Sequence, residues 1–580
     1  MNNQIKSCQN CKKDFVIAPE DFQFYERIKV PAPTFCPDCR LQRRMAFRNE
    51  RSLYKNICAL CKKQFVSMYS PDKPFIVYCK ECWYSDNWDP LQYGQDYDWD
   101  KPFFEQFREL MLKVPRIGIM HIRNNINADY ANYISASKNI YLSQSVIEGS
   151  ENIYYSRSID RSKEIFDCFN VKDSERCYEN VDGGRNYRSK FLVRSRDCID
   201  SAFLFDCVNC QNCIMSANLR NRQYVIRGKQ YSKEEYATAL EKIEFGKQSE
   251  IEKLKQEFEN VMEKALHKFA NITKSVTSTG DNIDNSKNAA YLFDAYNCEN
   301  VRYAARAIGC KDSYDIMGGA NLELVYEQMA GGYGSRNSLA LSHGEVTLES
   351  NYTDWCQSSS NLFGCISLRK KQYCILNKQY SEKEYKEFYP KIIEHMNTMP
   401  FEDRMGRMYR YGEFFPIEIS PFAYNETIAE EYFLLAKEEI MKKGYTWREL
   451  DPLPYVPTVK GKDLPDDIAN VENSATKELI ECENCKRVYR IVQPELEFLR
   501  REQIPLPRTC QECRHAKRLT LRNPLKLWSR KCMCDYKVWK NTAKHVHHPE
   551  DRCSNEFETS YSPERPEVIY CEQCYQAEIS

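Results

Sequence analysis

A short motif recurs about every twelve residues through the middle of this 580-residue chain. "SKNIYLS" begins at Ser137, "SENIYYS" at Ser150 and "SKEIFDC" at Ser162, and later "SKNAAYLF" begins at Ser286 and "CENVRY" at Cys298. Each unit opens with a small residue or Cys, and Asn, Asp or Glu usually follows two places later. One unit has room for a turn and a short strand, which buries no face alone, whereas stacked copies do. The repeat therefore predicts a β-solenoid.

The repeated region is itself duplicated. "SANLRNRQYVIRGKQYSKEEY" from Ser216 matches "CISLRKKQYCILNKQYSEKEY" from Cys365, so two solenoid blocks end alike. Ser232 with Glu235, and Ser381 with Glu384, are predicted capping boxes that begin a helix after each block. A coil of the solenoid could hold one twelve-residue unit or two.

Cysteines of the repeated region are predicted to fill the solenoid interior, because free Cys packs as a small hydrophobe. They are Cys168, Cys177, Cys198, Cys207, Cys210, Cys213, Cys298, Cys310, Cys356, Cys365 and Cys374. A metal or iron–sulfur site at Cys207, Cys210 and Cys213 is the alternative.

Cysteine pairs with metal-ligand spacing lie at both ends of the chain. A tight two-residue gap aims both sulfurs at one ion, and zinc prefers four such ligands in a tetrahedron. The pairs are Cys8 and Cys11, Cys36 and Cys39, Cys58 and Cys61, Cys79 and Cys82, then Cys482 and Cys485, Cys510 and Cys513, Cys532 and Cys534, Cys571 and Cys574. The start lacks the apolar stretch of a secretory signal, which predicts a reducing cytoplasm and metal thiolates. Export with cystines is the alternative.

The two ends are copies of one module, since "YSPDKPFIVYCKEC" from Tyr69 aligns with "YSPERPEVIYCEQC" from Tyr561. Sequential pairing of the knuckles gives two zinc ribbons per end, but a cross-braced pairing uses the same residues. In the second copy Cys532 and Cys534 form a shortened CxC, and a longer insert carries further candidate ligands or merely a polar loop. These are His545, His547, His548 and Cys553. We expect four structural zinc ions, or three if the Cys532/Cys534 site is empty.

A basic stretch follows the second knuckle of each copy. Residues 1–60 carry a net charge of +5 and residues 482–535 one of +7, in a chain whose total is zero. Spacings of three and four predict one cationic helical face that could hold phosphates of RNA. The candidates are Arg40, Arg43, Arg44, Arg48, Arg51, Arg514, Lys517, Arg518, Arg522 and Lys526. The alternatives are a solvated face, or arginines paired with carboxylates of the same chain.

Several longer strings mark the chain as a whole: "APTFCPDCR" from Ala32, "FRNERSLYK", "YSPDKP", "YGEFFP", "SPFAYNET", "RNPLKLW" and "YSPERPE". With these strings the chain resembles a family of uncharacterised Cys-rich zinc-ribbon proteins of candidate-phyla bacteria. The resemblance implies zinc at the knuckle cysteines and no particular activity.

The predicted fold is a mainly β, multidomain one, with paired zinc ribbons at each end of a duplicated solenoid. An apolar stripe from Ile251 to Phe269 predicts a helical hairpin that packs on its own protein or on a second copy. An aromatic strap from Arg410 and a proline-rich linker from Asp451 follow the second solenoid, with partner binding as the alternative for the strap. The predicted domains are 1–118 (zinc ribbons), 119–231 (solenoid), 232–282 (hairpin), 283–380 (solenoid), 381–475 (helix, strap and linker) and 476–580 (zinc ribbons).

The composition points away from several functions. No apolar run is long enough to cross a membrane, and we find no phosphate-binding loop, nucleophile elbow or HExxH motif. Zero net charge gives no protein-wide field for nucleic acid. We predict a non-enzymatic cytoplasmic scaffold that contacts structured RNA or a nucleoprotein through its basic ends, with a pure protein-interaction scaffold as the alternative. A second alternative is a carbohydrate-active solenoid enzyme that uses Asp167, Asp197, Asp200 and Asp206. The oligomeric state is left open.

Overall fold

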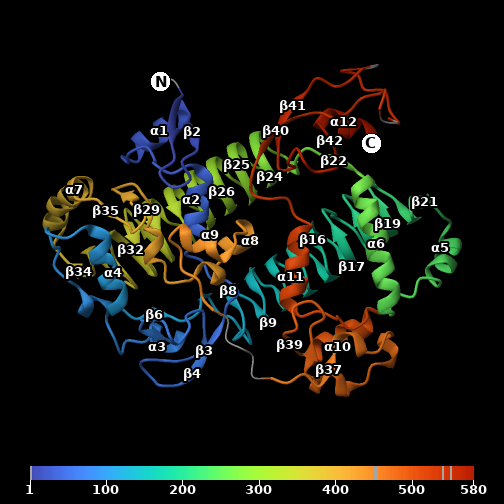
Figure 1. Cartoon of the computed structure of the whole chain (residues 1–580), viewed down its shortest axis with the longest axis horizontal. Coiled ribbons are helices and arrows are strands. Elements are labelled where there is room, and N and C mark those ends of the chain that lie inside the picture. Colours follow the sequence, from blue (N-terminus) through green and yellow to red (C-terminus); the bar gives the residue numbers. More distant parts are fainter. Residues whose placement is uncertain (1–2, 450–454, 539–540, 549–550, 580) are drawn as a thin grey trace. The chain divides into compact units, whose positions relative to one another are not determined.

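The structure is a computed structural model that describes residues 3–449, 455–538, 541–548 and 551–579. Residues 450–454 of the predicted linker lie outside this part. The chain folds into two compact units that exchange their ends (Figure 1). Unit 1 comprises Met1–Met120, Ala270–Glu449 and Leu525–Leu527, and unit 2 comprises His121–Phe269, Leu450–Pro524 and Trp528–Ser580. The N-terminal Cys-rich module therefore packs with the second solenoid, and the C-terminal module with the first.

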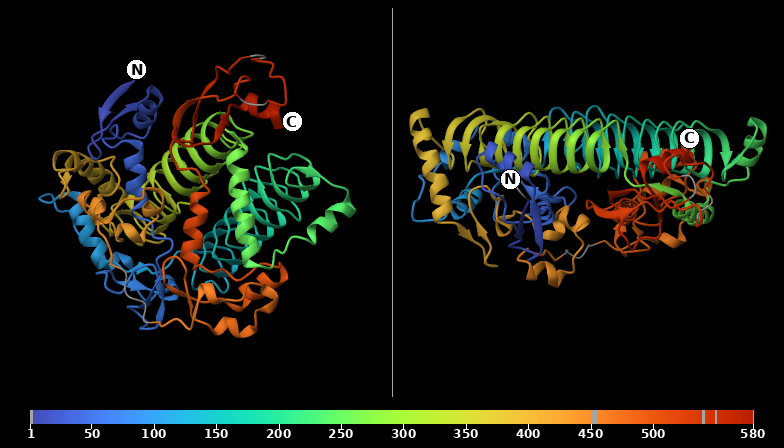
Figure 2. Two further views of the ribbon diagram at one scale, coloured as in Figure 1. Left: turned by 45° about the vertical axis from the view of Figure 1, so that its right-hand side comes forward. Right: turned by 90° about the horizontal axis from the view of Figure 1, so that it is seen from above.

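Each unit is built on a parallel β-solenoid whose coils stack along one axis (Figure 2). In the first solenoid Glu151 lies beside Lys163, and in the second Glu299 lies beside Lys311. One coil thus holds one twelve-residue unit, which resolves the choice between one unit and two. The predicted solenoid is confirmed in both blocks.

The strands are short and numerous. The first solenoid contains β7 (His121–Ile122), β8 (Asn132–Ser135), β9 (Lys138–Tyr141), β10 (Gln144–Ile147), β11 (Glu151–Tyr154), β12 (Arg157–Asp160), β13 (Lys163–Phe166), β14 (Phe169–Lys172), β15 (Glu175–Tyr178), β16 (Val181–Gly184), β17 (Tyr187–Val193), β18 (Ala202–Phe205), β19 (Gln211–Ala217), β20 (Gln223–Ile226) and β21 (Lys229–Gln230). The second contains β23 (Ile272–Thr273), β24 (Val276–Asp284), β25 (Lys287–Tyr296), β26 (Glu299–Ile308), β27 (Lys311–Ala320), β28 (Glu323–Gln328), β29 (Arg336–Leu341), β30 (Gly344–Leu348), β31 (Asn351–Thr353), β32 (Cys356–Phe363), β33 (Gln372–Ile375) and β34 (Lys378–Gln379). It begins before residue 283, where the repeat pattern placed its start.

The corners of each coil explain why Asn and Asp recur in the motif. Along the first solenoid nearly every third residue has a positive φ, as at Glu164, Asp167, Asn170 and Asp173. Side chains disfavour this left-handed conformation, and Asn and Asp tolerate it best after Gly. At exposed corners the amides also form ladders, and Asn285 Nδ2 donates to Asn297 Oδ1 one coil later at 2.7 Å. The residue two places after the opening Ser is therefore a corner residue.

The opening Ser of each unit forms an internal ladder. The Ser162 backbone N–H donates to Ser150 Oγ at 3.2 Å, and the Ser174 N–H donates to Ser162 Oγ at 3.1 Å. Cys replaces Ser in these columns, since the Leu219 N–H donates to Cys207 Sγ at 3.4 Å. The cysteines of the repeated region are all buried, which confirms their predicted place in the interior.

Unit 1 adds two small modules and a strap to the second solenoid. Its other elements are β1 (Gln4–Ser7), β2 (Asp14–Ile17), α1 (Pro19–Arg27), α2 (Pro37–Met45), β3 (Tyr54–Ile57), β4 (Gln64–Ser67), β5 (Val77–Tyr78), α3 (Lys80–Tyr84), α4 (Phe103–Lys113), β6 (Arg116–Ile117), α7 (Glu382–Thr398), β35 (Phe401–Glu402), β36 (Met408–Tyr409), α8 (Ala429–Tyr432) and α9 (Lys437–Lys442), with 3-10 turns at Pro90–Tyr93, Ile417–Ile419 and Tyr424–Glu426. The strap is ordered, and its Ile417 and Tyr424 share a core cluster with Leu41 and Met45 of α2.

Unit 2 combines the first solenoid with its own helices and modules. These elements are α5 (Lys233–Leu240), α6 (Gln248–Lys264), β22 (Leu266–Lys268), β37 (Val459–Lys460), β38 (Ile480–Glu481), β39 (Val488–Tyr489), α10 (Gln493–Arg501), α11 (Gln511–Thr520), β40 (Trp528–Lys531), β41 (Glu556–Thr559), β42 (Val568–Tyr570) and α12 (Glu572–Ile579), with 3-10 turns at Gly461–Asp463, Ile468–Asn470 and Asn473–Lys477.

The helices after each solenoid pack on their own unit. Both predicted capping boxes are present, at Ser232 for α5 and at Ser381 for α7. The apolar stripe of α6 is buried in the same cluster as Phe203 of the first solenoid. The helix ends at Lys264, however, and β22 then pairs with β42, so Phe269 is not part of the helical stripe. Among the described helices, none has the length and hydropathy needed to cross a bilayer.

Candidate metal centres

Four cysteine tetrads bring their sulfurs within 4.8 Å of one another. Unit 1 holds two and unit 2 holds two. The sets are Cys8, Cys11, Cys36 and Cys39; Cys58, Cys61, Cys79 and Cys82; Cys482, Cys485, Cys510 and Cys513; and Cys532, Cys553, Cys571 and Cys574. The pairing in unit 1 is sequential and not cross-braced. Each set could hold a metal ion, and four thiolates would close its coordination shell.

The local backbone favours the thiolate form of one cysteine in each of two sets. In the second tetrad of unit 1 the Cys79 N–H donates to Cys58 Sγ at 3.3 Å, and Cys79 is also the N-cap of α3. Burial opposes the charged form, but hydrogen bonds from backbone N–H groups prevail and lower the pKa of Cys58 to about 7. Cys482 of unit 2 has its pKa lowered to about 7 in the same way, with N–H bonds from Cys485 and Cys510 outweighing burial. The thiolate is the form of cysteine that binds metal.

The fourth tetrad differs from the predicted one, because Cys553 takes the place expected for Cys534. The β40–β41 hairpin ends with Lys531 beside Glu556, and the Cys532 N–H then donates to the Asn555 carbonyl at 2.8 Å. In the β3–β4 hairpin, the Cys58 N–H donates to the Lys63 carbonyl in the same position. Cys553 is therefore the equivalent of Cys61. Extending the ungapped match leftward, "CKKQFVSMYSPDKP" against "CSNEFETSYSPERP", carries this signal in the sequence.

Cys534 instead belongs to a separate group. Its sulfur lies within 4.8 Å of ligand atoms of His545, His548 and Cys574, so Cys574 is common to this group and to the fourth tetrad. The interval 535–552 is thus an insert within a knuckle, and it supplies two imidazoles.

The predicted phosphate-binding arginines of unit 1 face carboxylates of the second solenoid. Arg40 and Arg44, one turn apart on α2, both bind Asp315 at 3.0 Å. Arg43 binds Glu327 at 2.7 Å and Glu413 at 3.0 Å. The side chains of Arg40, Arg43 and Arg44 are at most 1% exposed.

Two further basic residues of unit 1 lie beyond the end of α2. Arg48 is buried and binds Glu50 at 2.6 Å, and Arg51 is half-buried at 3.7 Å from Glu431.

Unit 2 repeats this arrangement on the first solenoid. Arg514 and Arg518 of α11 both bind Asp167, at 3.0 and 2.7 Å. Arg522 binds Asp182 at 3.0 Å. Lys517 is exposed and lies 3.7 Å from Glu259. Lys526, which belongs to unit 1, is exposed as well.

The prediction that these arginines contact RNA needs correction. Arg40, Arg43, Arg44, Arg48, Arg514, Arg518 and Arg522 are buried. A guanidinium enclosed with carboxylates has no path to an external phosphate, and exchanging its partner would leave a buried charge unpaired. The alternative of pairing within the chain is the one found. Sequence reasoning missed the partners because Asp315 and Asp167 are corner residues, distant along the chain, whose outward direction depends on the left-handed backbone.

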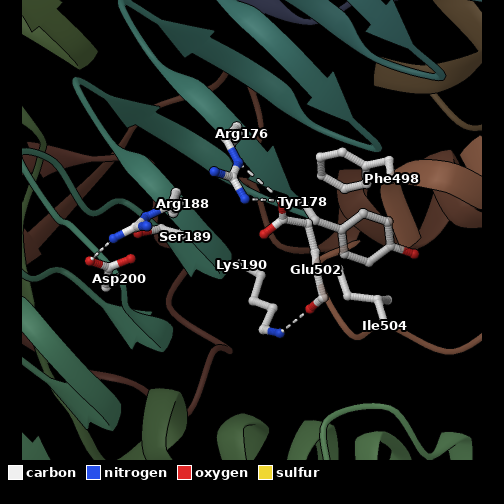
Figure 3. Close-up of a pocket in the computed structure, with 9 residues that line it drawn as sticks. All are labelled: Arg176, Tyr178, Arg188, Ser189, Lys190, Asp200, Phe498, Glu502 and Ile504. Carbon is white, nitrogen blue, oxygen red and sulfur yellow. Dashed lines mark hydrogen bonds and ion pairs between the residues drawn. The ribbon is translucent and has the colours of Figure 1, made fainter. Parts of the chain in front are cut away.

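A pocket of about 270 Å³ lies in unit 2 beside α10 (Figure 3). Lys190 donates to the Glu502 carbonyl at 2.8 Å, and burial lowers the pKa of Lys190 to about 8. The two carboxylates of the lining are both paired with arginines, Glu502 with Arg176 and Asp200 with Arg188. A lysine of this kind can act as a nucleophile, but no unpaired acid or base faces it among these lining residues.

The carboxylates considered for glycoside chemistry do not converge either. Asp167 is buried with Arg514 and Arg518, and Asp197 pairs with Arg185 at 2.5 Å. Asp206 binds Arg220 at 3.1 Å, and Asp200 belongs to the pocket described above. Each is paired with arginine side chains that the others do not share, whereas glycosidases place two carboxylates across one bond.

Comparison with models of known protein families and with curated proteins found no match for this chain. The resemblance to Cys-rich zinc-ribbon proteins therefore stays a prediction.

Proposed function

We propose that this protein is a non-enzymatic, zinc-dependent scaffold whose metal modules clamp two β-solenoids and which binds other proteins. The observation that carries this proposal is the inward direction of the arginines on α2 and α11. Each helix begins at a tetrad cysteine, Cys36 or Cys510, and ends in ion pairs with a solenoid. The metal would thus fix the first turn of the helix that holds the solenoid.

Zinc is proposed as the ion because the donor sets are sulfur-only and compact. Tetrahedral sulfur sites select zinc or iron–sulfur chemistry, and zinc needs no added sulfide. The cysteines form no disulfide among the described residues, which supports the metal interpretation and a cytoplasmic location.

A protein partner is favoured over RNA by the same ion pairs. Of the predicted phosphate ligands, the two exposed ones are Lys517 and Lys526. Two lysines supply little of the counterion release that drives RNA binding.

The test is crosslinking of the full-length protein in its native cell, followed by separate identification of attached protein and RNA. We expect specific protein partners, and RNA recovery that the double variant Lys517→Glu/Lys526→Glu leaves unchanged. RNA recovered in stoichiometric amount, and lost in that variant, would favour the RNA-binding scaffold instead. Purified wild-type protein with fewer than four zinc ions per chain would reject the zinc-dependent part.

A further inference from the structure

The insert between Cys534 and Cys553 brings together donors that the four tetrads leave unused. We propose that unit 2 holds an additional divalent metal ion in a site formed by Cys534, His545, His548 and Cys574. We call this the bridged site, because Cys574 Sγ would bind both this ion and the ion of the fourth tetrad. The inference rests on the fourth tetrad of the proposed function.

The distances between donor atoms suit one tetrahedral ion. Cys534 Sγ lies 3.3 Å from His545 Nδ1, His545 Nδ1 lies 3.1 Å from His548 Nε2, and His548 Nε2 lies 3.0 Å from Cys574 Sγ. Neighbouring ligands of a tetrahedral zinc lie roughly 3.3–3.8 Å apart, given Zn–N near 2.0 and Zn–S near 2.3 Å. Small outward adjustments would admit the ion.

The second nitrogen of each imidazole is held as it is in metal sites. His545 Nε2 lies 2.8 Å from Glu578 Oε1, and His548 Nδ1 lies 2.9 Å from the Asp551 carbonyl oxygen. An acceptor at that position fixes the N–H there and leaves the other nitrogen's lone pair for the metal. These two contacts select His545 Nδ1 and His548 Nε2, the two atoms that face each other and the sulfurs.

The burial of the two histidines and a hydrogen bond to Cys534 Sγ also support a bound ion. His545 is 1% exposed and His548 is 8% exposed, although both belong to a loop with few apolar residues. The Asn541 side-chain amide donates to Cys534 Sγ at 3.2 Å, a contact that stabilises a thiolate. Burying polar imidazole and thiol groups together costs free energy unless an interaction compensates, and a bound cation would supply that interaction.

A shared sulfur also limits the charge of the pair. Two divalent ions with five thiolates and two neutral imidazoles carry a net charge of about −1, whereas two separate tetrathiolate zinc sites carry about −4. Ions each about 2.3 Å from Cys574 Sγ lie no more than about 4.6 Å apart. The fourth tetrad and the bridged site would therefore form one binuclear centre, in which the insert completes the ligand set of the second ion.

His547 provides a matched control from the same insert. It is exposed, and its Nε2 lies 3.3 Å from Cys574 Sγ, so it is the competing imidazole. The geometry of the bridged site assigns no ligand role to it.

The experiment measures metal per chain in full-length protein loaded with zinc, by elemental analysis against protein concentration. We expect five ions in the wild type, four in Cys534→Ala and in His545→Ala, and five in His547→Ala. Four ions in the wild type, unchanged by Cys534→Ala, would overturn the bridged site and leave the proposed function intact. Loss of an ion in His547→Ala but not in His545→Ala would overturn the ligand assignment.

A second measurement needs no variant that might fail to fold. The same protein loaded with cadmium-113 should show two resonances that are mutually split, since the two ions share one sulfur. Five cadmium resonances without such splitting would refute the bridge, and four would refute the additional ion.

Discussion

Each unit holds its solenoid with an equivalent helix, α2 in unit 1 and α11 in unit 2, but the two helices are buried to different depths. In unit 1, Arg40 and Arg44 of α2 meet Asp315, and in unit 2 the aligned Arg514 and Arg518 of α11 meet Asp167. One corner carboxylate accepts two guanidinium groups spaced by one helical turn in both cases. The two units therefore share a docking arrangement, and not merely a metal site.

The difference lies between these two arginines. Arg43 of unit 1 is fully buried between Glu327 and Glu413, while the aligned residue of unit 2 is Lys517, whose side chain is 61% exposed. The strap of unit 1 supplies Glu413 and covers this face of α2. The strap thus turns a solvent-facing position into part of the core.

Removal of metal should give the largest effect. Zinc binding to such sites contributes on the order of 10 kcal/mol to folding, so a strong chelator should unfold the modules of both units. Amide hydrogen exchange should then lose protection around β3–β4 and β40–β41, while interior residues such as Ile153 and Ile165 keep theirs. Protection that survives in all four modules would contradict the metal-dependent clamp.

Replacement of the aligned residues on α2 and α11 tests the difference in depth directly. Arg43→Ala should lower the free energy of unfolding of unit 1 by about 3–5 kcal/mol, because it leaves the buried Glu413 without its guanidinium partner and Glu327 with Arg44 alone. Lys517→Ala should change that of unit 2 by less than about 1 kcal/mol. Urea unfolding followed by circular dichroism measures both. Equal effects would show that the strap does not distinguish the two units.

The cysteines of the solenoid interior and those of the tetrads should respond differently to replacement by serine. Cys168→Ser should cost less than about 1 kcal/mol, because its Oγ can accept the Asn180 N–H as the sulfur does at 3.3 Å. Cys168→Val removes that acceptor and should cost about 1–3 kcal/mol.

The matched change in a tetrad, Cys58→Ser, should instead remove one metal ion per chain. Thermal unfolding and metal analysis of the three variants distinguish these outcomes. A large loss of stability in Cys168→Ser would mean that the ladder requires sulfur.

Removal of an exposed ion pair between neighbouring coils should give the smallest effect. Arg185 and Asp197 lie one coil apart at 2.5 Å on the surface of the first solenoid. Arg185→Ala should cost about 0.2–1 kcal/mol, and the cost should shrink in 0.5 M salt, since exposed ion pairs are screened. A cost as large as that of Arg43→Ala would place surface pairs among the forces that hold the coils together.

Periodicity and spacing were sufficient to predict the solenoid and the cysteines of three of the four tetrads, although spacing left open how the knuckles pair. Both follow from local rules, because one coil is one repeat and one knuckle is one tight turn. Cys553 was named only as a candidate ligand of the insert and not as a member of the fourth tetrad, because the insert separates it from Cys532, although the flanking hairpin keeps their geometry.

The arginines were the larger error, and its cause is physical. A stripe such as Arg40, Arg44 and Arg48 has the same pattern whether it faces phosphate or carboxylate. The answer depended on Asp315, which is 275 residues from Arg40 along the chain. No local sequence pattern predicts a pairing over that distance. For the same reason, no local pattern predicts that each Cys-rich module packs with the more distant solenoid.

The exchange of ends bears on how the chain is made. Asp167 of the first solenoid precedes Arg514 by 347 residues. At a translation speed of about 5–20 residues per second, roughly 20–70 s pass between the synthesis of the two residues. During biosynthesis the first solenoid is therefore synthesised, with the Asp167 carboxylate still lacking its arginine partners, well before the ribosome has made the helix that covers it.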